Sequence, residues 1–302
     1  MQRILSAWAW VAAVSTVIFG FLYVAAVWLV TAPFDRGRYA AGRAFRQLAV
    51  TAVSLNPLWH FETDGDAPTD PRHPYVAVSN HESYADIFLL CFLPWEMKWL
   101  SKDTIFKIPC MGWMMHMAGD IPLTRDSAKS RGAALALCKD RLKKRVSVMI
   151  FPEGTRSIGG ELQPFFDGAF RVAIEMQCPV LPIAIAGTTH AMAKGTFQFM
   201  PARAEARVLP PVETTGLTVA DVAALRNRVR GMIDEARLAL RRENGLEALY
   251  EEVAREGEAI RAERKARKAR KAGARDAGTD GAAEPDESTS GASGLSGRDG
   301  AA

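Results

Sequence analysis

A long uncharged segment at the amino terminus limits the folds open to this chain. From Ile4 to Phe34 there is no charged residue, and aromatic and branched apolar side chains dominate. A helix of about 20 apolar residues crosses the hydrocarbon layer of a bilayer, so this segment can span a membrane or lie deep within one. A cleaved signal peptide is the alternative, but its apolar region normally has only about 7–15 residues. We therefore expect a membrane-embedded helix.

Basic residues flank this apolar segment unequally. Arg3 precedes it, whereas four arginines follow it closely, namely Arg36, Arg38, Arg43 and Arg46. Positive charge near the ends of a membrane helix favours the cytoplasmic side, so the rest of the chain is predicted to be cytoplasmic. A second apolar stretch from Leu48 to Phe61 is short for a span. It leaves open a helical hairpin that dips into one leaflet.

The overall composition is that of a globular protein. The 302 residues are 48% hydrophobic and 24% charged, and the formal net charge is +4. These values exclude collagen-like, wholly disordered and disulfide-scaffold proteins, and they do not favour nucleic-acid binding. The four cysteines are widely separated and form no C-x-x-C pair. This usage indicates buried thiols in a reducing compartment.

The composition changes near the carboxy terminus. No aromatic residue follows Tyr250, residues 261–275 are strongly basic, and Gly, Ala, Ser and Asp dominate from Ala272 onward. We predict a charged helical extension over residues 246–271 and a disordered tail over 272–302, because such a tail cannot offset the entropy of ordering. The basic run either binds anionic lipid headgroups or is the solvated end of a charged helix. Nucleic acid is disfavoured because no aromatic side chain is interleaved with the cations.

Residues 66–245 are predicted to form one folded domain that follows an anchoring segment over residues 1–65. Four short runs are typical of buried strands, namely Tyr75–Ser79, Asp120–Thr124, Val146–Phe151 and Val180–Ala186. Helical runs are expected over Ala85–Leu93, Ala128–Arg145 and Asp167–Gln177. An amphipathic helix follows Thr218, which makes an amino-terminal cap with Asp221. Strands that alternate with helices predict an α/β sheet with helices on its faces.

A polar cluster follows the first of these strands, with the sequence Ser79-Asn80-His81-Glu82-Ser83-Tyr84-Ala85-Asp86. If His81 lies in the strand-to-helix turn and Asp86 in the first helical turn, the carboxylate can fold back onto the imidazole. This contact fixes the tautomer and leaves the other ring nitrogen free to take a proton. The zinc-binding pattern H-E-x-x-H fails because Ala85 replaces its second histidine. We predict a catalytic histidine rather than a structural one.

The most specific signal in the chain follows the third strand, in the sequence Phe151-Pro152-Glu153-Gly154-Thr155-Arg156-Ser157. The amides of Gly154 and Thr155, together with the guanidinium of Arg156, can form an anion site. Arg125 follows the second strand and supplies another cation. Two guanidinium groups suit the oxygens of a phosphate, whereas either arginine alone could form a surface ion pair.

All these clusters are expected at one edge of the sheet, because ligands of open α/β sheets bind beyond the carboxyl ends of the strands. A fourth cluster, Pro179–Ile185 followed by Gly187-Thr188-Thr189, is almost wholly apolar. Its expected contribution is a wall for an apolar ligand.

Taken in order, the four clusters resemble the glycerolipid acyltransferase family, and most closely its 1-acylglycerol-3-phosphate acyltransferases. The first cluster matches the family's N-H-x4-D block, and the third matches its F-P-E-G-T-R-S block letter for letter. Gly119–Arg125 matches the second block, although Pro122 replaces a frequent aromatic residue. Pro182 falls in the fourth block, and Ala193-Lys194-Gly195 follows where the family often carries Pro-Lys-Gly. The resemblance covers roughly residues 70–200.

The resemblance implies an α/β fold whose mixed sheet is flanked by helices, with an amino-terminal membrane-embedded helix or helical hairpin. His81, oriented by Asp86, would take the proton from the free hydroxyl of 1-acylglycerol 3-phosphate. The alkoxide would attack an acyl thioester, either acyl-CoA or acyl carrier protein, and give phosphatidic acid. Membrane lipids would be further partners, and no metal or cofactor is implied.

The substrate phosphate would be held by a set of residues from two clusters, namely Arg125, Glu153, Gly154, Thr155 and Arg156. Because a carboxylate repels phosphate, we expect Glu153 to orient one of the arginines or to accept a glycerol hydroxyl. An acyltransferase for another acceptor is the main alternative, with a lysophospholipid, glycerol 3-phosphate or a lyso-ornithine lipid as the substrate. A membrane-anchored lipid-binding protein without activity is disfavoured, because His81 and Asp86 are both present.

Overall fold

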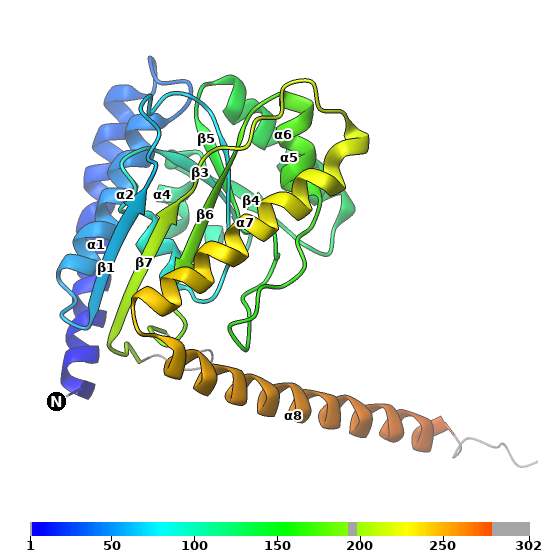
Figure 1. The fold of residues 1–302 in the computed structure, drawn as a ribbon. Coiled ribbons are helices and arrows are strands. Elements are labelled where there is room, and N and C mark those ends of the chain that lie inside the picture. The colour runs from blue at the N-terminus through cyan, green and yellow to red at the C-terminus, as the bar shows by residue number, and fades with distance from the viewer. Residues whose placement is uncertain (1, 193–197, 280–302) are drawn as a thin grey trace, which may run out of the picture. The chain divides into compact units, whose positions relative to one another are not determined.

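A seven-stranded sheet lies at the centre of the computed structural model, which describes residues 2–192 and 198–279. In spatial order the strands are β1 (Trp59–Gly65), β7 (Ala202–Val208), β6 (Val180–Ala186), β2 (Val76–Ser79), β5 (Ser147–Ile150), β3 (Met97–Lys102) and β4 (Ile121–Leu123). β6 and β7 are antiparallel, and all other neighbours are parallel (Figure 1). The predicted mixed α/β sheet is therefore confirmed.

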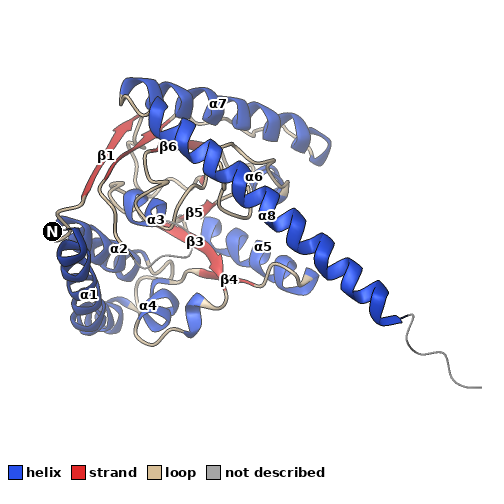
Figure 2. Ribbon diagram, turned by 90° about the horizontal axis from the view of Figure 1, so that it is seen from below, coloured by secondary structure: helices blue, strands red, loops and turns tan. Residues whose placement is uncertain are grey.

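Helices cover both faces of this sheet (Figure 2). One face carries α5 (Ala128–Lys143), α6 (Gly168–Met176) and α7 (Val222–Glu243). The other face carries α3 (Ala85–Leu90) and α2 (Tyr39–Ser54), against which α1 (Gln2–Thr31) and α4 (Met111–Ala118) pack. The short helices η1 (Ile105–Lys107) and η2 (Val219–Asp221) and the long helix α8 (Glu247–Thr279) complete the described elements.

The buried strands are apolar on both sides because each face of the sheet meets helices. In β2, Val76 and Val78 belong to the cluster beneath α5, α6 and α7, whereas Ala77 belongs to the cluster on the opposite face. In β5, Val148 and Met149 divide in the same way. Successive side chains of a strand point to opposite faces, so continuous apolar runs are the expected pattern here.

The structure confirms all four predicted strands but adds three that the sequence did not reveal: β1, β3 and β7. β7 has the sequence Ala-Arg-Ala-Glu-Ala-Arg-Val, and alanines occupy all of its buried positions except that of Val208. β3 contains Lys98, which is fully buried beside Glu96. A buried charged pair and a run of alanines both hide the hydrophobic alternation that marks a strand.

The apolar stretch from Leu48 to Phe61 is not one membrane-facing segment. Its first part is the end of α2, and its last part begins β1, which is an edge strand of the sheet. Trp59 and Phe61 both face the core and stack on each other with ring centroids 5.0 Å apart. The end of the helix and the edge strand are both apolar because they pack against the protein core.

Helix α1 and helix α2 form an antiparallel hairpin that packs along the side of the domain (Figure 1). Leu48 covers Gly20, and Val24 lies in a small core cluster with Ala44 and Met114. At the start of α1, Ser6 Oγ accepts a hydrogen bond of 3.0 Å from the amide of Phe199. One side of α1 is therefore joined to the rest of the chain along most of its length.

The other side of α1 exposes apolar side chains, including Ile4, Trp8, Val11, Val14, Ile18, Phe19, Leu22, Leu29 and Val30. Its most apolar 18-residue window has a mean hydropathy of 2.2, and among the described residues it is the one helix long and apolar enough to cross a membrane. The length and composition of α1 thus fit the expected membrane-embedded helix, and the hairpin with α2 is the arrangement that the structure adopts.

Two of the four arginines that follow the apolar segment are used inside the protein. The Arg46 side chain is buried and forms an ion pair with Asp120, and Arg43 donates to the carbonyl oxygen of Leu93 at 2.8 Å. These contacts fasten α2 to the sheet region. Arg46 is buried and Arg43 is partly buried, so the Arg46 guanidinium does not face a membrane surface and adds nothing to the predicted charge asymmetry.

The chain contains two compact units. Residues up to Gly257 form the first unit, and the part of α8 from Glu258 onward belongs to the second. Strand β1, which ends at Gly65, belongs to the sheet of the first unit. Helix α8 continues to Thr279, past the predicted start of the disordered tail at Ala272, and residues 280–302 lie outside the described part.

Candidate active site

The His81 imidazole lies where β2 ends and before α3 begins. Its Nδ1 atom is 2.7 Å from Oδ2 of Asp86, in the first turn of α3. The carboxylate therefore folds back onto the ring as the spacing predicted. The ring also stacks on Phe151, with centroids 4.0 Å apart and an angle of 15° between the planes. Two independent contacts thus fix both the ring plane and the nitrogen that faces the carboxylate.

The Asp86 carboxylate is held by its own loop and by the end of β6. Its Oδ2 accepts hydrogen bonds from the amides of Glu82 at 2.7 Å and Ser83 at 3.0 Å. Its Oδ1 accepts from the hydroxyl of Thr188. The side chain is fully buried. Donors on both oxygens leave the carboxylate one orientation, so it can act as a fixed partner for His81.

Asn80 explains why the loop leaves the sheet in the observed direction. Its side-chain nitrogen Nδ2 donates to the carbonyl oxygen of Ile185 at 2.9 Å, and its side-chain oxygen Oδ1 accepts from the backbone amide of Ile185 at 2.8 Å. The side chain thus continues the ladder between β2 and β6 beyond the last residue of β2. His81 starts from a position that is tied to the rigid sheet.

The hydrogen bonds of Glu153 within the described residues go to backbone amides and to neither arginine, and its predicted contact with a glycerol hydroxyl stays a prediction. Its Oε1 accepts from the amide of His81 at 2.6 Å, and its Oε2 accepts from the amide of Gln163 at 2.8 Å. Both oxygens are therefore occupied by backbone donors that would otherwise be buried without partners. Burial raises the pKa of Glu153 to about 7. In this structure Glu153 clamps the loop after β5 to the loop that carries His81.

The turn after Glu153 explains the glycine of the third cluster. Gly154 has a φ of +66°, and a Cβ atom there would lie 2.8 Å from Cε2 of Phe166. An L side chain is strained in that conformation, so the positive φ favours glycine here. The amide of Ser157 donates to the carbonyl oxygen of His81 at 2.8 Å, and Thr155 is exposed. The turn is therefore attached directly to the loop that carries His81.

The two predicted arginines occupy different positions. The Arg156 guanidinium lies over the ring of Tyr84, 3.7 Å from its centroid, and Tyr84 belongs to the loop that carries His81. Arg125 is exposed after β4, which is two strands away from β5, or about 10 Å at the usual spacing. Within the described residues its guanidinium makes no hydrogen bond or ion pair. The structure therefore joins Arg156 to the His81 group and places Arg125 farther along the same edge.

Two residues that contact the His81–Asp86 pair were not predicted to do so, namely Thr188 and Phe151. Thr188 was assigned only to the end of the fourth cluster, with no role of its own. Its position just after β6 places it at the same edge of the sheet as His81. Phe151 was predicted at the end of a buried strand, and its ring stacks on that of His81. Ala193-Lys194-Gly195, which matched a family motif, lies outside the described residues.

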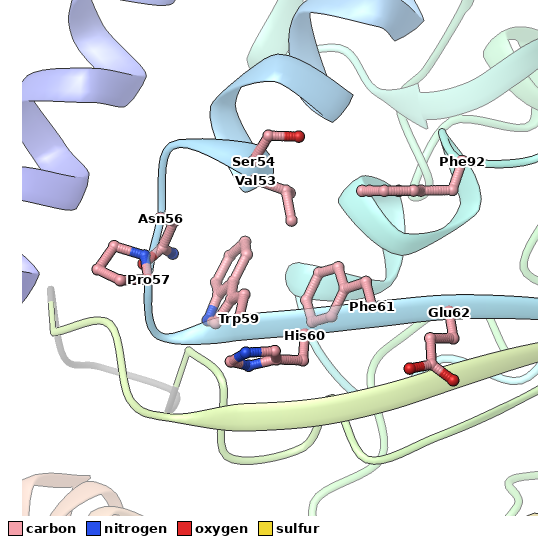
Figure 3. A pocket seen from close by; sticks show the side chains of 9 residues that line it. All are labelled: Val53, Ser54, Asn56, Pro57, Trp59, His60, Phe61, Glu62 and Phe92. Carbon is pink, nitrogen blue, oxygen red and sulfur yellow. The ribbon is translucent and has the colours of Figure 1, made fainter.

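A shallow cleft of about 350 Å³ lies away from His81, between the end of α2, β1 and the segment after α3 (Figure 3). Trp59, Phe61 and Phe92 form its apolar walls, and His60 and Glu62 of the edge strand add polar groups. It shares no residue with the group around His81.

Comparison with known proteins agrees with this geometry. The sequence model of the Acyltransferase family matches residues 60–186. Human 1-acyl-sn-glycerol-3-phosphate acyltransferase alpha is 32% identical over 216 residues, which are 70% of this chain and 75% of that protein. The chloroplastic 1-acyl-sn-glycerol-3-phosphate acyltransferase BAT2 of Brassica napus is 39% identical over 54% of this chain and 47% of its own length. This chain thus spans about half the length of the plant relatives.

A solved structure shows the same fold. The 1-acyl-sn-glycerophosphate acyltransferase PlsC from Thermotoga maritima superposes with a TM-score of 0.64, covering 80% of this chain and 96% of that chain at 24% identity. The human relative extends the sequence similarity well beyond the motif region. On this similarity and on the matching motif residues, the chain belongs to the 1-acyl-sn-glycerol-3-phosphate acyltransferase family.

Proposed function

We propose that this protein transfers an acyl chain from an acyl thioester to the free hydroxyl of 1-acylglycerol 3-phosphate, which gives phosphatidic acid. The observation that carries the proposal is the 2.7 Å contact between His81 Nδ1 and a fully buried, fourfold-bonded Asp86 carboxylate. The names of the relatives support the acceptor. The donor, either acyl-CoA or acyl carrier protein, is proposed from the chemistry alone.

In the proposed reaction, Nε2 of His81 takes the proton of the acceptor hydroxyl while Asp86 stabilises the imidazolium that forms. The alkoxide oxygen attacks the thioester carbonyl carbon, and a tetrahedral oxyanion results. Collapse of this intermediate forms the ester and breaks the carbon–sulfur bond, and the imidazolium returns its proton to the departing thiolate. A positioned general base contributes about 10²–10⁴-fold, and the rest must come from orienting the two substrates.

The acceptor phosphate is proposed to bind at the turn that follows β5. Arg156 supplies a guanidinium beside the His81 loop, and Gly154 and the exposed Thr155 supply backbone amides. The Gly154 amide also donates to the carbonyl oxygen of Phe151 at 3.1 Å, so the phosphate would share this donor. Arg125 completes the site from the far side, where its exposed guanidinium has no competing partner in the described structure. Glu153 supports this site through its two backbone contacts.

Membrane attachment is proposed through the exposed apolar side of α1. Lysolipid and product both reside in a bilayer, so an attached enzyme avoids moving long acyl chains into water. We place the catalytic domain on the cytoplasmic face, where thioester donors are found; exposed Arg36 is consistent with this side. The basic run over residues 261–275 is proposed to add attraction to anionic headgroups.

The direct test is an acceptor panel. Purified full-length protein in mixed micelles is tested in two series, one with radiolabelled acyl-CoA and one with radiolabelled acyl carrier protein. In each series the acceptors, in separate reactions, are 1-acylglycerol 3-phosphate, a lysophosphatidylcholine, glycerol 3-phosphate and a lyso-ornithine lipid. We expect ester formation with the first acceptor at a kcat/KM at least tenfold above the others. A preference for another acceptor would replace the proposed substrate. Failure with every acceptor and with both donor types would favour an inactive lipid-binding protein.

Arg156→Ala tests the phosphate site. We expect the KM for 1-acylglycerol 3-phosphate to rise about 10- to 100-fold, because hydrogen bonds to a charged partner contribute about 1.5–3 kcal/mol. The KM for the acyl donor should stay within twofold. Arg171→Ala, which removes an exposed arginine paired with Glu175 on α6, is the matched control. A change confined to the donor KM would contradict the assignment of Arg156.

A further inference from the structure

A buried carboxylate next to His81 has no place in the proposed mechanism. Glu82 lies between His81 and Asp86 in the active-site loop, and its side chain is almost completely buried. Its Oε1 accepts a hydrogen bond of 2.9 Å from Arg241, and its Oε2 accepts one of 2.5 Å from the hydroxyl of Tyr250. Burial raises the pKa of Glu82 and Arg241 lowers it. Burying a carboxylate costs free energy unless partners compensate for the lost water. The positions of the partners of Glu82 therefore indicate what this residue does.

Arg241, in the last turn of α7, joins Glu82 to a second active-site loop. The same Nη2 atom that bonds Glu82 also donates to the carbonyl oxygen of Gly160 at 2.6 Å. Gly160 follows the turn that carries Arg156. Arg237, one turn earlier on α7, donates to the same carbonyl at 2.9 Å. The end of α7 therefore connects the loop after β2 with the loop after β5.

Tyr250, in the first turn of α8, joins Glu82 to a third loop. Its hydroxyl donates to Glu82 and accepts a hydrogen bond of 2.8 Å from the amide of Gly187, directly before Thr188. Thr188 in turn binds the Asp86 carboxylate. The Arg241 guanidinium lies 3.4 Å from the centroid of the tyrosine ring, which aligns the two side chains. Figure 1 shows the corner between α7 and α8 beside the end of β6.

We propose that Glu82, Arg241 and Tyr250 form a positioning cluster that sets the geometry of the His81–Asp86 pair. The cluster, named here the corner cluster, ties together the loops after β2, β5 and β6, each of which supplies a contact to the pair or to its neighbours. None of its members touches the reacting atoms. The chain segment at the junction of α7 and α8, far from the family motifs, thereby becomes part of the active-site framework.

The physical basis is that the pair has to be held within a fraction of an ångström. Removing the Tyr250 hydroxyl would leave both Glu82 Oε2 and the Gly187 amide without their partner, and buried polar groups without partners rearrange. The loops that carry His81 and Thr188 would then shift relative to each other. A displacement of about 1 Å of a catalytic group can lower a rate roughly 10²-fold.

Tyr250→Phe in the full-length protein is the test, since it removes one oxygen atom and keeps the ring. We expect kcat to fall roughly 10- to 100-fold while the KM values for both substrates stay within twofold. The assay temperature is set at least 20 °C below the unfolding midpoint of every variant, so a change in the folded fraction cannot lower kcat. Tyr39→Phe is the matched control. Like Tyr250, Tyr39 accepts a hydrogen bond from a backbone amide, that of Glu96, and donates one, here to the carbonyl oxygen of Pro71. It touches no active-site loop.

A second measurement separates this inference from the proposed function on which it rests. The five histidines are labelled with ¹⁵N, and the His81 ring signals are assigned with the variant His81→Ala. We expect Tyr250→Phe to weaken or shift the Nδ1–H signal of His81, and Tyr39→Phe to leave it unchanged. If wild-type protein acylates no lysolipid, the proposed function fails while this signal still tests the corner cluster. An unchanged signal, or an unchanged kcat in an active enzyme, overturns the inference.

Discussion

His81→Ala is expected to lower kcat at least about 10³-fold, because the acceptor hydroxyl then has no group to take its proton. Binding of both substrates should change little, since the proposed phosphate contacts come from Arg156 and the turn after β5. The measurement is initial ester formation from 1-acylglycerol 3-phosphate and one acyl thioester, followed over at least four decades of enzyme concentration. Turnover within tenfold of wild type would remove His81 from the role of base.

The control for this variant has to separate chemistry from folding, because the His81 ring is buried against Phe151. His73→Ala replaces an exposed histidine whose ring contacts Tyr75, and it should retain full activity. Circular dichroism and the unfolding midpoint of His81→Ala should show that the chain is still folded at the assay temperature.

Asp86→Asn is expected to lower kcat by about 10³–10⁴-fold, although the side chain keeps its shape. An amide cannot stabilise an imidazolium as a carboxylate does, and its NH₂ group competes for the ring nitrogen, which favours the wrong tautomer. Its NH₂ group would also face either the amides of Glu82 and Ser83 or the hydroxyl of Thr188, all of which donate in the native site. The loss is measured in the same assay as for His81→Ala.

Asp140→Asn provides the matched control, since Asp140 is a half-exposed carboxylate on α5 that pairs with Arg141 and Lys144. Its activity should equal that of wild type. Combining Asp86→Asn with His81→Ala gives a further check: if the two groups act as one unit, the double variant is no slower than His81→Ala alone. Additive losses would show that Asp86 acts independently of the imidazole.

The fold class and the His81–Asp86 contact followed from the sequence because short-range patterns determine both. The spacing of five residues across a strand-to-helix turn restricts where the carboxylate can lie, and the structure puts it 2.7 Å from the ring. The capping box of Thr218 and Asp221 is equally local, and it is present. In each case the interacting residues are separated by a few positions, so the backbone leaves few alternatives.

The role of Glu153 could not be predicted, because its partners are backbone amides whose positions depend on the whole loop. From the sequence its charge suggested a contact with an arginine, whereas in the structure it accepts from the amides of His81 and Gln163. The corner cluster was hidden for a related reason. Glu82 and Tyr250 are separated by 168 positions, and no periodic pattern relates one to the other.

The cytoplasmic orientation stays a prediction, because it rests on a general rule about arginines, and two of these arginines have partners inside the protein. Arg46 was counted as a cation near a membrane helix, but Asp120, a member of the second motif block, neutralises it in the interior. Whether an arginine faces a headgroup or a buried carboxylate depends on tertiary contacts, and composition carries no information about them.

The packing of α1 against α2 and α4 has a consequence for how the anchor and the enzyme depend on each other. Because Val24, Ala44 and Met114 share one small core, α1 is packed directly onto the domain and is not attached to it by a flexible linker alone. With α1 in a bilayer, as proposed above, a change in bilayer thickness or charge would act on these packed side chains. The lipid environment and the activity would then be coupled through side-chain packing.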